Sequence, residues 1–118
     1  MIIRRSQFDA FRPSVEETFE ARLASFLREQ FPETAGADEA QFRVEIRAQI
    51  NASRSYGLET EQQIATYVVS ACALGTDFDK RFPAAEQVLT FAFLSAEEKT
   101  KWLESWTRVL FESLEEAG

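Results

Sequence analysis

The amino-acid sequence predicts an all-α fold, a compact bundle of about five helices that forms a homodimer. Apolar residues recur at helical spacing in several segments, and residues typical of helix ends stand between these segments. The best strand candidate, residues 87–94, lies between helix starts and is therefore predicted to be helical. With 118 residues, 45% of them hydrophobic, residues 1–118 are expected to fold as one domain. The 11 phenylalanines predict a bulky aromatic core or an aromatic surface left for a partner.

Two helices are predicted before Pro32. The first is a short helix over residues 6–11. The second runs from Val15 to Gln30, because Ser14 and Glu17 have the spacing of a capping box and apolar residues follow at helical intervals. Pro32 is expected to end this helix, since proline disfavours a helical conformation in the residue before it.

The next helix is predicted from Asp38, as its N-cap, to about Tyr56. Gly57 stands where a residue in the left-handed conformation commonly ends a helix. The apolar residues of this segment recur every four positions, at Phe42, Ile46 and Ile50. A loop over residues 33–37 is expected to connect this helix to the one before it.

A second capping box, formed by Thr60 and Gln63, predicts a helix that ends at Gly75. This segment is apolar around most of its circumference, so the helix is expected to be the central one of the bundle. Cys72 lies within its apolar stripe and is interpreted as a buried structural residue, because the chain contains no histidine to activate a thiol.

Two more helices are predicted in the C-terminal part of the chain. Pro83 suits a first helical turn, and the inward face of its helix is expected at Val88, Leu89, Ala92 and Phe93. Ser95 and Glu98 form a third capping box, at the start of the last helix. Its amphipathic stripe is predicted to contain Trp102, Leu103, Trp106, Val109, Leu110 and Leu114.

The two tryptophans of the last helix are interpreted as core residues, as an interface, or as both on one broad stripe. A C-terminal amphipathic helix is a natural place for a dimer interface. The predicted dimer seam consists of Trp102, Trp106, Val109 and Leu110.

Charge and composition exclude several classes of function. The net charge of −7 disfavours binding to the phosphates of a nucleic acid. The favoured interpretation of this charge is solubility, and the alternative is steering toward a basic protein partner. No apolar run approaches the roughly 20 residues of a membrane span, and the first residues, Met1–Ser6, do not resemble a signal peptide. A single cysteine fits a reducing compartment. We therefore expect a cytoplasmic protein with no nucleic-acid and no membrane partner.

The stretch from Gly57 to Asp79 contains acidic residues and no basic one. Its four carboxylates are the candidates for binding a basic partner: Glu59, Glu61, Asp77 and Asp79. Asp77 and Asp79 also resemble half of a metal site, but the loop lacks the other oxygen ligands of a calcium site. The favoured interpretation is a polar turn in which Phe78 points into the core. We expect no metal and no cofactor.

No enzyme signature is present in the sequence. It contains no nucleophile paired with a base, no phosphate-binding glycine loop and no carboxylate pair placed in a dry cleft. We therefore expect a binding protein and no catalytic residues.

Several short motifs occur in an order that resembles a family of small proteins of Gram-negative bacteria, whose genes lie in type VI secretion effector clusters. The motifs are Met1–Arg5 with Phe8 and Phe11, Phe26–Arg28 with Phe31–Pro32, Tyr56–Glu61 and Gly75–Asp79. Within such clusters the chain is similar to helical co-chaperones. The resemblance implies a non-secreted, dimeric binding protein whose partner is the adaptor chaperone that loads an effector onto its spike-tip protein. It implies no catalytic residues.

Two other functions fit the sequence. An acidic immunity protein would neutralise a basic toxin without an adaptor, and a purely structural subunit would have its dimer seam as its function. An enzyme has almost no residue-level support.

Overall fold

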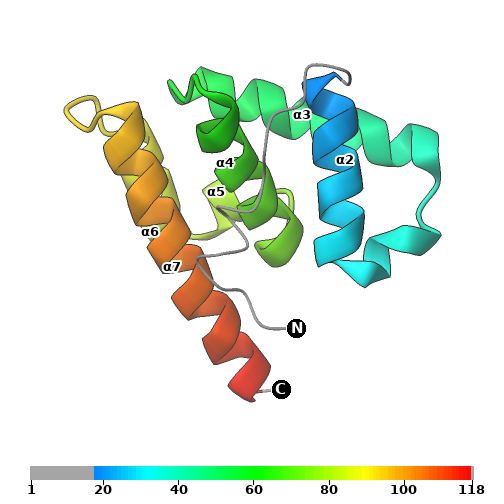
Figure 1. Cartoon of the computed structure of the whole chain (residues 1–118). Coiled ribbons are helices and arrows are strands. Elements are labelled where there is room, and N and C mark those ends of the chain that lie inside the picture. Colours follow the sequence, from blue (N-terminus) through cyan, green and yellow to red (C-terminus); the bar gives the residue numbers. More distant parts are fainter. Residues whose placement is uncertain (1–17, 118) are drawn as a thin grey trace.

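Seven helical segments make up the part of the chain that this computed structural model describes, residues 18–117 (Figure 1). They are α2 (Phe19–Gln30), the 3₁₀ helix η1 (Pro32–Gly36), α3 (Glu39–Ser55), α4 (Glu61–Leu74), α5 (Phe78–Arg81), α6 (Pro83–Thr90) and α7 (Ala96–Ala117). The described residues contain no strand, so the predicted all-α fold is confirmed. The helix predicted over residues 6–11 and the capping residues Ser14 and Glu17 lie outside the described part of the chain.

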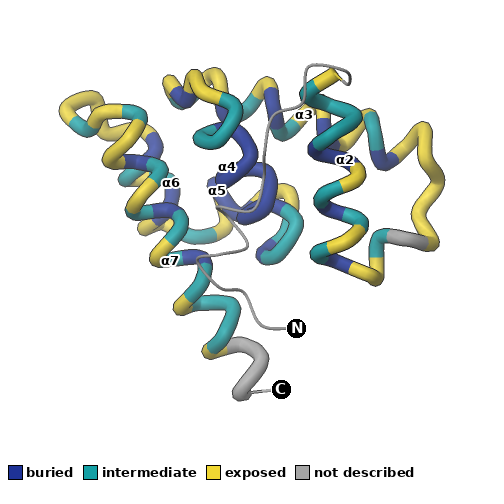
Figure 2. The backbone as a smooth tube through the Cα atoms, viewed as in Figure 1, coloured by how far each residue is buried: buried dark blue, intermediate teal, exposed yellow. Residues whose placement is uncertain are grey.

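Helix α4 is the centre of the bundle, as its apolar circumference predicts. It packs against α7 on one side and α3 on the other, and it also contacts α2 and α5. Every residue from Ile64 to Ala71 is buried, and Figure 2 shows α4 as the most continuously buried element. Because α4 contacts most of the other elements, its two ends decide where the connecting turns and their polar residues lie.

Both ends of α4 have the structures that the sequence predicts. The Thr60 hydroxyl accepts a hydrogen bond from the Gln63 N–H at 3.1 Å, and the Gln63 Oε1 accepts one from the Thr60 N–H at 3.1 Å. Gly75 has φ of 111° at the C-terminal end, a conformation that side chains strain. Both ends of α4 are therefore set by local hydrogen bonds and local backbone conformation, which require no tertiary contact.

The end of α3 is a Schellman motif built around Gly57, which has φ of 89°. The Leu58 N–H donates to the Ser53 carbonyl at 3.1 Å, and the Gly57 N–H donates to the Arg54 carbonyl at 3.0 Å. Leu58 is 1% exposed, so the motif also fixes an apolar side chain in the core. At the other end, the predicted N-cap is confirmed, because the Asp38 carboxylate accepts from the Gln41 N–H at 3.0 Å.

Helix α2 begins later than predicted. The sequence predicts a start at Val15, but Thr18 has an extended backbone (φ −66°, ψ 154°) and is the N-cap of a helix that starts at Phe19. The Thr18 hydroxyl accepts from the Ala21 N–H at 3.1 Å. The predicted start is therefore wrong, because a second capping residue four positions after Ser14 caps the helix.

The region between α4 and α7 differs most from the prediction. Phe78 and Asp79, predicted as part of a turn, begin the short helix α5, and α6 ends at Thr90 rather than continuing through Phe93. Leu89 is buried as predicted, but Ala92 and Phe93 are exposed, so the predicted inward face is wrong at these two positions. The Leu94 N–H donates to the Phe91 carbonyl, closing a turn that leads into the Ser95 cap of α7.

Helix α7 packs on α4 through a stripe that contains polar residues. Leu103 and Thr107 are both fully buried, and Lys99 is 9% exposed. The Thr107 hydroxyl donates to the Ser70 hydroxyl of α4 at 2.9 Å, and Ser70 donates to the Thr66 carbonyl at 3.0 Å. The Lys99 ammonium donates to the Tyr56 carbonyl at the end of α3 at 2.9 Å, where the helix dipole favours a positive charge.

Candidate functional site

Two of the predicted partner-binding carboxylates lie at the start of α4. Glu59 is exposed in the turn before the helix. Glu61 is the first helical residue, and its Oε2 accepts from the Arg22 guanidinium of α2 at 2.9 Å. The local excess of negative charge seen in the sequence is therefore reduced by a basic residue that the fold brings from another helix.

The other two carboxylates follow the end of α4. Asp77 is exposed and lies 3.6 Å from the Arg81 guanidinium. Asp79 is buried, and its Oδ2 accepts a hydrogen bond from the Tyr56 hydroxyl at 2.6 Å. Phe78 between them is fully buried, as predicted. Neither aspartate caps a backbone N–H of α5 with its side chain, so the polar turn has a different hydrogen-bond pattern from the predicted one.

These four residues do not form one surface. The 14 residues of α4, a length of about 20 Å, separate Glu61 from the turn that contains Asp77. Asp79 is turned inward and cannot touch a partner without breaking its bond to Tyr56. Within the described residues no group of three or more acidic or cysteine side chains is arranged to hold a metal ion.

The predicted dimer seam divides into packed and exposed residues. Trp102 and Trp106 are half-buried and stack on each other with ring centroids 5.1 Å apart. Trp106 also contacts Phe82 edge-on at 5.4 Å, so it belongs to the packing of α7 against α5 and α6. Leu110 is half-buried, whereas Val109 is 60% exposed. Pairing with a second copy stays a prediction.

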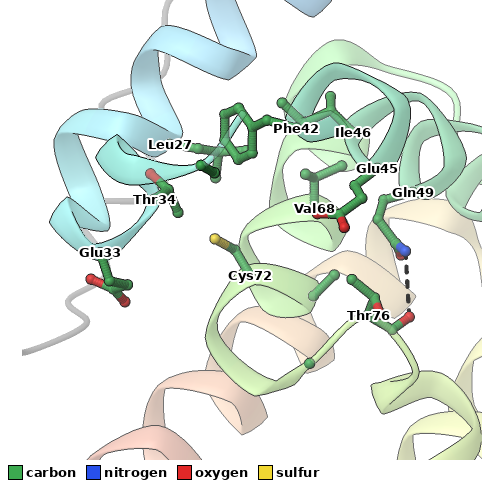
Figure 3. Close-up of a pocket in the computed structure, with 13 residues that line it drawn as sticks. Leu27, Glu33, Thr34, Phe42, Glu45, Ile46, Gln49, Val68, Cys72 and Thr76 are labelled. Atoms are coloured by element: carbon green, nitrogen blue, oxygen red, sulfur yellow. Dashed lines mark hydrogen bonds between the residues drawn. The ribbon is translucent and has the colours of Figure 1, made fainter. Parts of the chain in front are cut away.

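A concave site lies between α2, η1, α3 and α4 (Figure 3). It is a cleft of about 340 Å³, within the range of ligand-binding pockets. Its walls are mainly apolar and come from segments far apart in the sequence. The lining residues are Leu27, Glu33, Thr34, Ala37, Phe42, Glu45, Ile46, Gln49, Val68, Ala71, Cys72, Gly75 and Thr76.

The arrangement of the walls follows from the amphipathic helices that meet there. Leu27 of α2, Phe42 and Ile46 of α3, and Val68 of α4 are core residues whose side chains also reach the cleft. Cys72 of α4 points into the space that these residues surround (Figure 3). It is half-buried rather than fully buried as predicted, because the cleft leaves its thiol side open.

Two exposed carboxylates stand at the cleft, Glu33 on η1 and Glu45 on α3 (Figure 3). Neither forms an ion pair with another residue of the described part of the chain. Burial, together with the negative charges of these two carboxylates, raises the pKa of the Cys72 thiol to about 12. Both carboxylates are thus close enough to the interior of the cleft to disfavour ionisation of the Cys72 thiol, and both carry negative charge.

The remaining polar groups of the cleft also offer acceptors. Gln49 lies one turn after Glu45 on α3, and its Nε2 donates to the Thr76 carbonyl at 3.4 Å. Its Oε1 is buried and has no hydrogen-bond partner among the described residues. Arg28 lies beside the cleft, with its guanidinium 4.5 Å from the Phe42 ring centre, and it donates to the Thr34 carbonyl and to Glu39.

Cys72 is expected to react slowly with alkylating reagents. Since the ordinary thiol pKa is 9.0, a pKa of about 12 lowers the thiolate fraction at pH 8 about a thousandfold. Iodoacetamide labelling of the native protein, followed by mass spectrometry, measures the rate, and the same reaction in urea gives the reference. Equal rates in the native and unfolded protein would contradict this prediction.

A pair of exposed phenylalanines stands at the opposite side of the central helix from the cleft, in the turn between α6 and α7. Phe91 is 52% and Phe93 is 89% exposed, and their rings meet edge-on at 5.8 Å. The sequence predicts Phe93 on an inward helical face, so this exposed pair is not foreseen.

No helix of the described chain combines the length and the apolar character that crossing a membrane requires. The cleft itself is not predicted from the sequence, because its residues come from four helices and a turn. The sequence predicts Phe42, Ile46 and Cys72 as apolar helix residues and Gly75 as a helix end, but it predicts no site at them. Comparison with known proteins gives no match to a family model, a curated protein or a solved structure.

Proposed function

We propose that this protein is a non-enzymatic binding protein whose cleft receives an apolar segment of a basic partner. The partner would be the adaptor chaperone that loads a type VI secretion effector onto its spike-tip protein, which is the role that the sequence resemblance implies. In this role the protein acts as a co-chaperone. The observation that supports the proposal is the apolar cleft with two exposed carboxylates at its mouth, neither of which forms an ion pair within the described residues.

Different residues of the cleft would provide the apolar contact with the partner and the charge that attracts it. Leu27, Phe42 and Val68 provide apolar surface that a partner side chain can cover, which is the term that contributes most to protein–protein affinity. Glu33 and Glu45 provide attraction and orientation for a positively charged segment. The overall charge of −7 adds long-range steering toward such a partner.

A blocked cleft tests this proposal. Cys72→Phe places a ring in the cleft, whereas Ala84→Phe adds the same ring to an exposed position of α6, away from the cleft. Each tagged variant is co-expressed with the adaptor and the effector of the same gene cluster. We expect the wild-type protein and Ala84→Phe to recover the adaptor, and Cys72→Phe to lose about thirtyfold in affinity, the usual effect of removing one binding anchor. Far-UV circular dichroism checks that each variant is folded.

The same experiment separates the alternatives. Glu59→Gln tests the carboxylate group at the start of α4, and a loss of adaptor binding with this variant but not with Cys72→Phe would move the interface away from the cleft. Recovery of the toxin alone, together with protection of cells that lack the adaptor, would identify an immunity protein and refute the co-chaperone proposal.

A further inference from the structure

The charges of the cleft specify its occupant further. Both charged side chains in its lining, Glu33 and Glu45, are carboxylates, and the Gln49 Oε1 is a further acceptor with no partner among the described residues. The Thr34 hydroxyl already donates to the Phe31 carbonyl at 2.7 Å. An occupant that brings further acceptors would leave buried groups unsatisfied, which costs free energy. The cleft therefore fits an occupant that carries N–H donors.

We infer that the cleft binds an arginine side chain of the partner, with its methylene stem along the apolar wall and its guanidinium toward Glu45 and Gln49. This inference rests on the proposed function and names the residue that the partner inserts. Arginine combines an apolar stem with a planar head of five donors, so one side chain satisfies both parts of the cleft. The head stays charged at any pH at which the protein is folded.

The geometry of α3 supports this assignment. Glu45 and Gln49 are four residues apart, so their side chains lie on the same face of the helix and reach the same end of the cleft. A guanidinium placed there can donate to the Glu45 carboxylate and to the Gln49 Oε1 at once. The Gln49 Oε1 is at present buried without a partner, and a rotation of its amide would present it to the incoming donor.

The surface beside the cleft already holds one guanidinium in a comparable way. Arg28 lies over the Phe42 ring at 4.5 Å, while its N–H groups donate to the Thr34 carbonyl and to Glu39. Arg28 pairs with Glu39, which also accepts from Arg43 at 3.1 Å, so within the described residues the charges of Glu33 and Glu45 remain to attract a further cation. Phe42 lines the cleft, so the new side chain would lie against the same aromatic residue.

Small probes test this inference on the full chain without any partner. n-Butylguanidinium contains the stem and the head of arginine, n-butylammonium has a compact head, and n-pentanol is uncharged. In ¹⁵N-resolved NMR titrations we expect n-butylguanidinium to shift the amide signals of Gln49, Val68 and Cys72. We expect n-pentanol to bind about tenfold more weakly, since it carries no positive charge and offers a single hydroxyl donor to the carboxylate.

Variants of the acceptors provide the control. Glu45→Gln with Gln49→Leu should weaken n-butylguanidinium about tenfold and leave n-pentanol unchanged, whereas Glu97→Gln, on the exposed surface of α7, should change neither. Raising the salt concentration should weaken only the charged probes. Equal binding of n-pentanol, stronger binding of n-butylammonium, or shifts confined to another surface would overturn the inference.

The probe titrations and the adaptor recovery experiment can give independent results. Recovery of the adaptor with no preference for n-butylguanidinium would refute the arginine and keep the co-chaperone proposal. Selective binding of n-butylguanidinium without recovery of the adaptor would keep the cleft chemistry and refute the proposed partner.

Discussion

Replacing Phe78 by alanine should destabilise the protein by about 3–5 kcal/mol, the usual cost of deleting a buried aromatic ring. Phe78 is fully buried at the start of α5, with its ring centre 5.0 Å from that of Tyr67 on α4 and 6.4 Å from that of Trp106 on α7. Its loss removes the contact that joins these three helices. Because a domain of this size is stable by about 5–15 kcal/mol, the variant should unfold at a much lower urea concentration.

Phe93→Ala is the matched control, since it makes the same chemical change at a residue that is 89% exposed. We expect its free energy of unfolding to lie within about 0.5 kcal/mol of the wild-type value. Urea unfolding followed by circular dichroism measures both variants. Similar losses in the two variants would mean that Phe93 is packed rather than exposed, and that the turn between α6 and α7 is placed wrongly.

The helix ends were predictable because their signals are local. Asp38, Thr60 and Ser95 each cap a backbone N–H three residues away, and Gly57 and Gly75 adopt the positive φ that their positions in the sequence predict. These interactions need only a few neighbouring residues. The central place of α4 was predictable for a related reason, because its apolar circumference leaves it no stable position at the surface.

The predicted face of α7 is right only in part. Its stripe contains Leu103, which is fully buried, but also Val109, which is 60% exposed, and it omits the buried Lys99 and Thr107. The difference arises because Lys99 and Thr107 are polar in the sequence and buried in the fold. Their hydrogen bonds to Tyr56 and Ser70 connect residues 43 and 37 positions apart, which no local pattern reveals.

The acidic stretch from Gly57 to Asp79 also has tertiary partners that the local sequence does not show. Within the sequence it has no basic counterpart, yet Arg22, 39 residues from Glu61, forms an ion pair with it. Asp79 is drawn inward by Tyr56, 23 residues away. The cleft likewise exists only where four helices meet. Charge surfaces and concave sites depend on tertiary contacts, whereas the helices and their caps largely do not.

Removing the Tyr56 hydroxyl should destabilise the protein, whereas removing the Tyr67 hydroxyl should not. The Tyr56 hydroxyl donates to the buried Asp79 carboxylate at 2.6 Å, so Tyr56→Phe leaves a buried charge with one hydrogen bond fewer and should cost about 2 kcal/mol. The Tyr67 hydroxyl is buried near Asp79, but it forms no hydrogen bond of good geometry with any residue of the described chain. Tyr67→Phe should therefore be neutral or slightly stabilising. Urea unfolding at pH 8 measures both, and a loss of about 2 kcal/mol for Tyr67→Phe would show that its hydroxyl has a partner.

At alkaline pH the free energies of unfolding of both phenylalanine variants should rise relative to that of the wild-type protein. Burial raises the pKa of both tyrosines above 10.0, and the nearby Asp79 adds to the increase, for Tyr56 through their hydrogen bond and for Tyr67 through its charge. The unfolded chain then releases these protons near pH 10 while the folded protein retains them, so the wild-type protein loses stability as pH rises above 10. Each phenylalanine variant lacks one of these contributions. The deficit of Tyr56→Phe should shrink between pH 9 and about 11, and Tyr67→Phe should become more stable than the wild type; differences that do not change with pH would contradict the raised pKa values.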